Sequence, residues 1–327
     1  MLLVLTNSAD ATASFLLPIL DEAGIPFCRL DTDTLVSKIK FTYRLGQATI
    51  TLDGHLLQPQ DVHAIWYRRP QTIKHAQFDS TPEGDYVRAE WSEFLECFFA
   101  HVPREKWVNH PSCNAVASRK LEQLTTAATL GFKVPDTLVT QRPEELQHFY
   151  REHHGQVIIK PISTGYIERK GEDKDSLIYT NRVLRSHLDN LDDLANCPAL
   201  FQKFIQKKND VRITVVGNDI HAVSLVASDP SGEQRCDIRR NNMADVIYGL
   251  VTLPEKVRQS IRRLMRHYKL QFGAIDMVVS VSGEWYFLEI NPNGQWAWLD
   301  QTGGTNIGAS FVRKFRQKGR KGRPTPV

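Results

Sequence analysis

The sequence predicts an α/β protein with more than one packed unit. Three observations favour this class: a strand, a helix and a second strand fill the first 31 residues, further strands alternate with amphipathic helices, and two long apolar strands follow the last of these helices. With 327 residues, 41% of them hydrophobic and 24% charged, the chain can form two or three cores of ordinary size. Wholesale disorder is therefore excluded.

A first α/β domain is expected over residues 1–112. LLVLT is a short apolar strand, and DATASFLLPILDEAGIP predicts a helix that stops at Gly24 before the next strand, FCRLD. FTYRL and ATITL flank Gly46 and Gln47 as a hairpin, and VHAIWYRRP adds a strand. In DYVRAEWSEFLECFFA, apolar side chains recur at helical spacing, so this helix is expected to pack on the sheet.

A second domain is expected over residues 113–312, after the proline-containing connection HVPREKWVNHPSCN. SRKLEQLTTAATLGFKVP predicts a helix that ends at Gly131, and strands follow in QVIIKP, SLIYT, ALFQKFI, VRITVVG and DIHAVSLVA. TLPEKVRQSIRRLMRHYKL predicts an amphipathic helix, with Thr252 and Glu255 in the register of a capping box. Two final strands, FGAIDMVVS and EWYFLEIN, complete the domain.

The formal charge of +4 comes from the C-terminus. Residues 313–323 hold seven Lys or Arg and no acid, so that the remainder has 34 basic and 37 acidic residues, a net charge of −3. The body is therefore not a polyanion-binding surface, and nucleic acid is not an expected partner. Residues 313–327 are expected to be a disordered, solvated tail, although a basic arm could also contact RNA, a membrane or an acidic peptide.

Nothing in the sequence indicates export or a membrane location. No apolar run approaches the ~20 residues that span a bilayer, and MLLVLTNSAD lacks a basic leader and a small-residue cleavage site. The cysteines are odd in number and include no C-x-x-C pair, which indicates thiols in a reducing compartment rather than a disulfide framework or a zinc site. The expected location is the cytoplasm.

The last two strands carry the strongest chemical signal. If Ser282 and Gly283 form a two-residue loop, Asp276 lies directly across from Glu289, with Cβ atoms only ~5 Å apart. Because side chains alternate along a strand, Asn291 points to the same face as Glu289. Two carboxylates this close repel unless a cation lies between them, and carboxylate and amide oxygens suit Mg²⁺ with nucleotide phosphates nearby.

Two alternatives to this metal site remain open. The acids could face solvent and pair with arginines, or a register slip of one residue could separate them. A cation for phosphates is available in Lys160, which ends the apolar strand of VIIKP, although a lysine that snorkels to solvent has the same pattern. Lys120, early in SRKLEQL, is a weaker candidate. Trp296 and Trp298 could form a peptide-contact surface or belong to the core, and at least one of them is expected in the core.

The order of these elements resembles the ATP-grasp ligases. Those proteins run from a small α/β domain to a helix with one lysine, a lid whose strand ends in another lysine, a hinge strand that brackets adenine, and a hairpin with Asp, Glu and Asn as magnesium ligands. The resemblance implies an ATP-grasp fold, with a pre-ATP-grasp domain over 1–112, a lid over roughly 133–205 and a C-terminal subdomain over 206–312. It also implies ATP and Mg²⁺ as cofactors.

The match is closest to the branch that closes rings in microviridin-like peptides, the graspetide synthetases. The similar motifs are WYRRP, DVRITVVG, DIRR, GAIDM and LEINPNGQW. By resemblance, Lys120 and Lys160 bind ATP phosphates, Asp210 holds the ribose, and the catalytic residues are Arg212, Asp237 and Arg239. The hinge residues that contact adenine are Gln202, Lys203, Phe204 and Ile205, and the metal ligands are Asp276, Glu289 and Asn291.

The resemblance implies an ATP-dependent peptide macrocyclase. Its partner would be a ribosomal precursor peptide with a leader segment, and the enzyme would be a homodimer. An Asp or Glu side chain of the peptide would become an acyl phosphate and then join a Ser or Thr hydroxyl as an ester, or a Lys amine as an amide. The alternatives are a ligase that adds a free amino acid to a protein or small acid, and a non-catalytic nucleotide- or RNA-binding protein.

Overall fold

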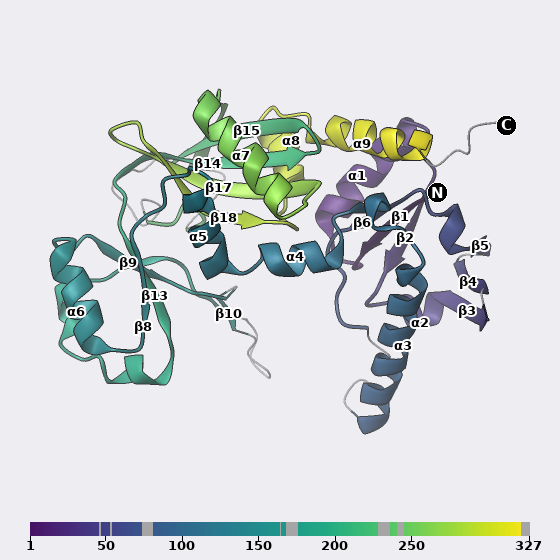
Figure 1. Ribbon diagram of the computed structural model, residues 1–327, viewed down its shortest axis with the longest axis horizontal. Helices are drawn as coiled ribbons and strands as arrows, with labels where there is room; N and C mark the ends of the chain where they lie inside the picture. Colours follow the sequence, from purple (N-terminus) through teal and green to yellow (C-terminus); the bar gives the residue numbers. More distant parts are fainter. Residues whose placement is uncertain are drawn as a thin grey trace.

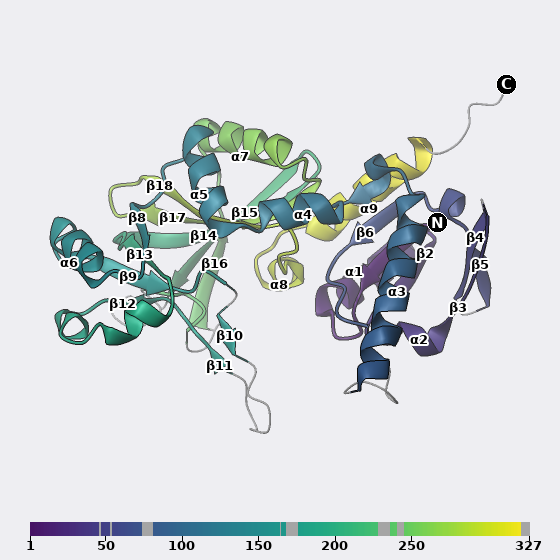
Figure 2. The same ribbon diagram turned by 60° about the horizontal axis from the view of Figure 1, so that its bottom comes forward.

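The computed structural model describes residues 1–45, 47–52, 54–73, 81–163, 165–167, 176–227, 236–240 and 245–321. Figures 1 and 2 show an N-terminal α/β unit at one end, a lid at the other, and a large antiparallel sheet between them. The α/β class predicted from the sequence is therefore confirmed. In the described ranges, no helix combines the length and apolar character that crossing a membrane requires.

The N-terminal unit is built on a parallel sheet of order β2-β1-β6-β7. Its strands are β1 (Leu2–Thr6), β2 (Phe27–Asp31), β6 (Ala64–Tyr67) and β7 (Trp107–Val108). Helix α1 (Ala11–Glu22) begins at Asp10, whose carboxylate accepts from the N–H groups of Thr12 and Ala13. The helix ends before Gly24, which takes a φ of +66°.

Two cores lie on opposite faces of this sheet. Side chains of α1 and of α9 (Ile307–Lys321) pack with Leu2, Val4 and Trp66 on one face. On the other face, α3 (Pro82–Ala100) and α2 (Leu35–Lys38) pack with Leu3 and Leu5 and with a small three-stranded sheet. That small sheet contains β3 (Ile39–Arg44), β4 (Gln47–Leu52) and β5 (His55–Leu57).

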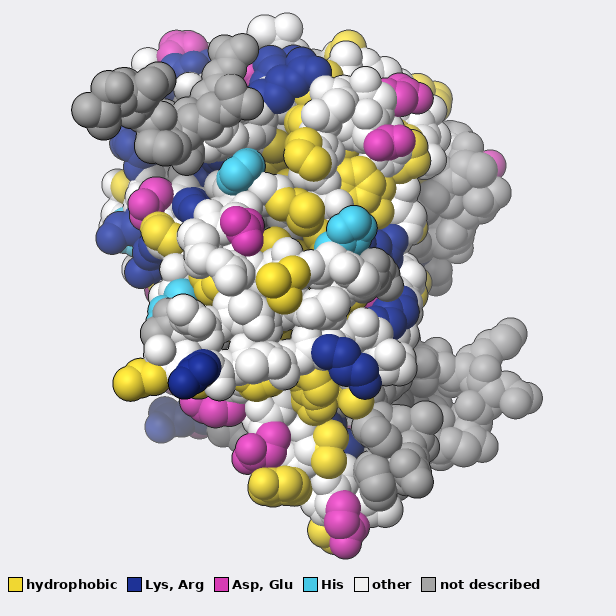
Figure 3. Space-filling model, turned by 90° about the vertical axis from the view of Figure 1, so that its right-hand side faces the viewer, with side chains coloured by type: hydrophobic (Ala, Val, Ile, Leu, Met, Phe, Trp, Pro, Cys, Tyr) yellow, Lys and Arg dark blue, Asp and Glu magenta, His cyan; other side chains and the backbone are white. Residues whose placement is uncertain are grey.

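The predicted hairpin of the small sheet is confirmed with a shifted turn. Arg44 pairs with Gln47, so Gln47 belongs to the strand and not to the loop; Gly46 lies outside the described residues. On the outer surface of this end of the molecule, Lys and Arg side chains are interspersed with Asp and Glu (Figure 3).

The lid is a four-stranded sheet of order β12-β9-β13-β8. Its strands are β8 (Thr137–Thr140), β9 (Val157–Lys160), β12 (Asn181–Arg182) and β13 (Ala199–Lys203), and a two-stranded hairpin of β10 (Tyr166–Ile167) and β11 (Ser176–Leu177) adjoins them. Helix α6 (Pro143–Glu152) covers the sheet through Leu146 and Phe149. Neither β8 nor α6 was predicted from the sequence.

The large sheet has the order β16-β15-β14-β17-β18 and every pairing in it is antiparallel. Its strands are β14 (Lys207–Val216), β15 (Asp219–Ala227), β16 (Val246–Leu250), β17 (Phe272–Ser280) and β18 (Trp285–Asn291). Helices α5 (Lys120–Thr129) and α7 (Glu255–His267) cover one face, where they pack on Ile213 and Ile275. Because side chains alternate, Arg212 and Asp276 point to the other face.

The predicted capping box of α7 is wrong. Pro254 is the N-cap residue and no side chain caps the helix, because the helix begins two residues later than a Thr252 cap requires. Helix α4 (Pro111–Ala117) connects the N-terminal unit to α5, and α8 (Ala297–Thr302) follows the last strand.

The expectation of a disordered tail is also wrong for residues 313–321, which form the second half of α9. Phe311 and Phe315 are four residues apart and therefore share one face of the helix, where both are buried against Trp66. Arg313 and Arg316 of the same segment are exposed. Residues 322–327 lie outside the described residues.

Candidate active site

A cavity of about 950 Å³ lies between the lid and the face of the large sheet that α5 and α7 leave uncovered. Eight of the predicted site residues line it: Lys120, Lys160, Asp210, Arg212, Asp237, Arg239, Asp276 and Glu289. They come from α5, from the end of β9, from the three strands β14, β17 and β18, and from the loop that follows β15. The fold therefore gathers residues that lie up to 169 positions apart in the sequence.

Asp276 and Glu289 are directly opposed across β17 and β18, as predicted. The predicted two-residue loop is wrong, because Ser280 N–H donates to Glu284 O (2.8 Å) and leaves a three-residue loop that ends at Gly283 with φ +83°. A bulge at Leu288 then shifts the register back, since Met277 pairs with Phe287 but Asp276 pairs with Glu289. The longer loop and the bulge shift the register by one residue in opposite directions, so Asp276 still lies opposite Glu289.

Each of the two acids has a cationic partner. Arg212 Nη1 donates to both carboxylate oxygens of Asp276, at 2.8 and 2.9 Å, and Lys120 Nζ lies 3.6 Å from Glu289 Oε2. The acids thus pair with cations, as one alternative expected, but they do so inside the cavity and not on an outer surface. Burial raises the pKa of Asp276, the charge of Arg212 opposes this rise, and the charge of Glu289 adds to it.

The donor set of this hairpin fits Mg²⁺. The carboxylates of Asp276 and Glu289 lie opposite each other, where a cation would relieve their repulsion, and hard oxygen ligands are those that Mg²⁺ prefers. Asn291 lies two residues beyond Glu289 and is paired with Ala274. Its Oδ1 accepts from Asn293 N–H (2.9 Å) and keeps a second lone pair, although Asn291 is not among the described residues that line the cavity.

Two lysines supply positive charge beside these acids. Lys120 Nζ donates to Pro161 O (3.3 Å) and Ser163 O (2.9 Å), which ties α5 to the lid. Lys160 ends β9 and points into the cavity, where burial lowers its pKa to about 8 against the opposing charge of Glu289. A buried ammonium of this kind can bind phosphate oxygens as a compact point charge.

Asp237 and Arg239 form a closed pair at another side of the cavity. The Asp237 carboxylate accepts from Arg239 Nε (2.8 Å), from Arg239 Nη2 (2.6 Å) and from Thr180 N–H (3.2 Å). Burial alone would raise the pKa of Asp237, but the hydrogen bonds and charge of Arg239 lower it overall. The Asp237 side chain is only 6% exposed and that of Arg239 is 56% exposed, so the arginine is the partner that a ligand can reach.

The hinge side chains are not among the described residues that line the cavity. Gln202 is fully buried and donates to Thr137 Oγ1 (2.8 Å), while its own Oε1 is buried without a partner. The N–H groups of Lys203 and Phe204 already donate to Asp136 O (2.9 Å) and Gln156 O (2.8 Å). These two amides are therefore occupied, and Ile205 adjoins them in the same strand connection.

Asp210 faces the cavity in an ion pair with Lys207, at 2.7 Å. Burial raises the pKa of Asp210, and the charge and hydrogen bond of Lys207 act against this rise. The carboxylate is thus held at the cavity wall by a residue of its own strand.

Apart from Trp298, the remaining lining residues were not predicted from the sequence. Tyr248 and Trp298 form an aromatic pair with ring centroids 5.7 Å apart, and Met277, Leu288 and Thr180 complete the wall. Trp296 is fully buried, so the expectation that at least one of the two tryptophans belongs to the core is confirmed. Because the register shifts at Leu288, the neighbouring residues Leu288 and Glu289 both line the cavity, and no sequence pattern marks this shift.

Two family models match the chain. Residues 117–315 match the RimK-like ATP-grasp domain, and residues 1–114 match the MvdD pre-ATP grasp domain. No curated protein matches the chain.

Solved structures resemble the chain over nearly its whole length. A RiPP-associated ATP-grasp ligase from Chryseobacterium gregarium, in complex with ADP and a leader and core peptide, is 30% identical over 97% of this chain and 96% of the other, with a TM-score of 0.82. The macrocyclase MdnC from Microcystis aeruginosa MRC, bound with precursor peptide MdnA, is 26% identical over 95% and 97%, with a TM-score of 0.82. The macrocyclase MdnB of the same organism is 25% identical over 95% and 97%, with a TM-score of 0.76.

Proposed function

The chain belongs to the family of ligases with a RimK-like ATP-grasp domain, and we propose that it is an ATP-dependent peptide macrocyclase. The observation that carries this proposal is the joint match of both domains to enzymes solved with precursor peptides. In the proposed reaction, Asp and Glu side chains of a leader-bearing precursor peptide are joined to Ser or Thr hydroxyls or to Lys amines.

The proposed reaction has two steps. A carboxylate oxygen of the peptide attacks the γ-phosphorus of ATP, ADP leaves, and the peptide carries an acyl phosphate. A hydroxyl or amine of the same peptide then attacks the acyl carbon, inorganic phosphate leaves, and the nucleophile gives up its proton. One water is removed from the peptide for each ring.

The cavity residues are suited to bind and orient these reactants. Asp276, Glu289 and Asn291 would hold Mg²⁺, which when bound neutralises charge on the phosphates. Lys120 and Lys160 would hold the phosphate oxygens, since both ammonium groups lie beside Glu289.

The two arginines and Asp237 would act on the transferred group. Arg212 would stabilise the charge that develops on it, because its guanidinium is fixed beside the metal ligand Asp276. Arg239 would bind the acyl phosphate with its exposed face. We assign Asp237 the role of orienting Arg239 and not that of a general base, because both of its oxygens already accept hydrogen bonds.

The nucleotide base and sugar would lie along the hinge. Gln202, Lys203, Phe204 and Ile205 would bracket adenine, with carbonyl groups and apolar surface as the available contacts, because two of the N–H groups are occupied. Asp210 would bind the ribose hydroxyls from the cavity wall.

The remaining organisation is part of the same proposal. We place a domain boundary at residues 112 and 113, the lid at roughly 133–205 and the C-terminal subdomain at 206–312. We also propose a homodimer, which sedimentation analysis would test. The exposed thiols of Cys97 and Cys197 are consistent with a reducing, cytoplasmic location.

The direct test is ADP release by the purified protein with ATP, Mg²⁺ and a peptide encoded beside its gene. ADP formation that needs the peptide, and that stops when the peptide's Asp and Glu are replaced by Asn and Gln, supports the proposal. ADP formation that needs a free amino acid instead would identify a ligase of the second kind. If no ADP forms under either condition, the proposed peptide ligase activity is overturned.

A further inference from the structure

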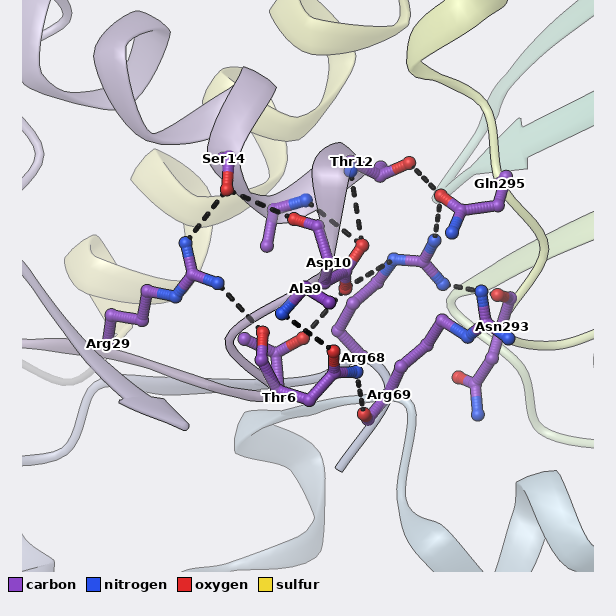
Figure 4. A network of polar contacts seen from close by, with 12 residues as sticks. Thr6, Ala9, Asp10, Thr12, Ser14, Arg29, Arg68, Arg69, Asn293 and Gln295 are labelled. Atoms are coloured by element: carbon purple, nitrogen blue, oxygen red, sulfur yellow. Dashed lines mark hydrogen bonds and ion pairs between the residues drawn. The ribbon is translucent and has the colours of Figure 1, made fainter. Parts of the chain in front are cut away.

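A polar network connects the N-terminal unit to the loop that follows β18 (Figure 4). Arg68, at the end of β6, is fully buried, and its Nε lies 3.5 Å from Asp10 Oδ2. Its Nη1 donates to Asn293 O, and its Nη2 donates to Gln295 Oε1 at 2.8 Å. Arg68 therefore joins a residue of the first α/β unit to the loop that follows β18.

Gln295 is the junction of this network. Its side-chain Oε1 accepts from Arg68 and from the hydroxyl of Thr12, both in the N-terminal unit. Its backbone oxygen accepts from Arg212 Nη2 at 3.0 Å, and Arg212 in turn holds Asp276. One residue thus contacts both the N-terminal unit and the arginine of the cavity.

The charges in this network restrict where Arg212 can lie. Burial lowers the pKa of Arg68 to about 10; the charge of Asp10 opposes this fall, and the like charge of Arg212 adds to it. Each arginine is balanced by its own acid, Asp10 or Asp276. Because unpaired buried charge is costly, neither arginine can leave its partner at low cost.

Close packing adds a second restriction. A Cβ at Gly294 would lie 2.7 Å from Arg212 Nη2 and 2.4 Å from Ala274 Cβ, so the loop passes directly over the guanidinium. Arg212 is therefore held by Asp276 on one side and by the Gly294 to Gln295 backbone on the other.

We propose that Arg68 and Gln295 are positioning residues for the metal site. They fix Arg212, and through it Asp276, so the N-terminal unit sets the geometry of the magnesium ligands without contacting substrate. This role rests on the proposed function, because it takes Asp276 as a metal ligand. Partners that orient metal ligands typically affect metal affinity by roughly 10- to 100-fold.

The test is calorimetric titration of ADP with and without Mg²⁺, which needs neither peptide nor turnover. Gln295→Ala removes the contacts to Arg68 and Thr12 but keeps the backbone oxygen that binds Arg212. Arg68→Lys keeps the charge opposite Asp10 but cannot reach all three partners of the guanidinium. Arg316→Ala is the matched control, since Arg316 donates to Ala23 O (2.7 Å) between the same two parts of the molecule, away from the network.

We expect Mg²⁺ to strengthen ADP binding equally in the wild type and in Arg316→Ala. In Gln295→Ala and Arg68→Lys, this enhancement should fall by roughly 10-fold or more, while ADP affinity without Mg²⁺ changes less than about twofold. Equal enhancement in all four proteins would overturn the positioning role and leave the proposed function intact. No enhancement in the wild type would instead remove the metal site, and with it both proposals.

Discussion

Gly294→Ala tests how tightly the PNGQW loop is fitted over the hairpin of β17 and β18. The added Cβ would lie 2.4 Å from Ala274 Cβ and 2.7 Å from Arg212 Nη2. Carbon atoms in contact are normally about 3.5–4.0 Å apart, so the loop must move by about 1 Å or more. Ala274 is fully buried in β17, and Arg212 is held by Asp276, so neither neighbour can give way easily.

The expected cost appears in both stability and activity. Overpacking of this kind lowers the free energy of unfolding by about 1–3 kcal/mol. A displacement of about 1 Å at reacting groups can lower the rate by roughly 100-fold. Urea unfolding followed by circular dichroism measures the first effect, and peptide-dependent ADP release measures kcat for the second.

Gly283→Ala is the matched control in the same hairpin. Gly283 has φ +83° with nothing within 4 Å of its would-be Cβ, so alanine costs about 1–2 kcal/mol in a left-handed conformation but touches nothing in the cavity. It should keep the wild-type kcat. If Gly294→Ala kept that kcat as well, or if both variants lost it equally, the close fit over Arg212 would not matter for the reaction.

Three further predictions concern separate parts of the molecule. Burial lowers the pKa of Lys160 to about 8, so its charge is present below that pH and is lost as the pH rises through it. The affinity of the wild type for ADP should therefore weaken above pH 8. In Lys160→Arg, the Kd for ADP measured by titration should not change over the same pH range. Asp237→Asn should leave ADP release largely intact but lower the number of rings formed per ADP, because Arg239 loses its orienting partner. Mass spectrometry counts the rings. If ADP release and ring formation fell equally, Asp237 would instead have a role in the first step. Phe315→Ala should lower the free energy of unfolding by about 3–5 kcal/mol in urea, whereas Gln317→Ala on the exposed side of α9 should change it by less than about 0.5; equal effects would mean that the tail helix does not pack as described.

The acids of the hairpin were predictable from local pattern, whereas Asp210, Arg212, Asp237 and Arg239 were expected only from the family resemblance. Acids inside apolar strands, as in GAIDMVV and YFLEIN, stand out against the cost of burying them, and β alternation places them on one face. The opposition of Asp276 and Glu289 was nevertheless predicted through a wrong loop, and it holds only because the bulge at Leu288 compensates. Register in a bulged hairpin depends on packing that a single strand pattern does not record.

Other features depend on contacts between distant segments. Either Arg68 or Arg69 could end β6 in solvent, and only the loop around Gln295, 227 positions later, makes Arg68 the buried one. The many basic residues of 313–321 favour a solvated tail by charge pattern. Phe315 nevertheless packs against Trp66, which lies far away in the sequence. Helix α6 is a different case, because Leu146, Phe149 and Tyr150 recur at helical spacing and its signal was present in the sequence but was missed.

The central claim is that this ATP-grasp ligase closes rings in a peptide with Glu289 at its metal site. Intact mass spectrometry of the peptide encoded beside the gene, co-expressed with the wild type or with Glu289→Ala, tests it most directly. The account predicts successive losses of one water per ring with the wild type and an unchanged peptide with Glu289→Ala. An unchanged peptide with the wild type, or the same water losses with the variant, would contradict it.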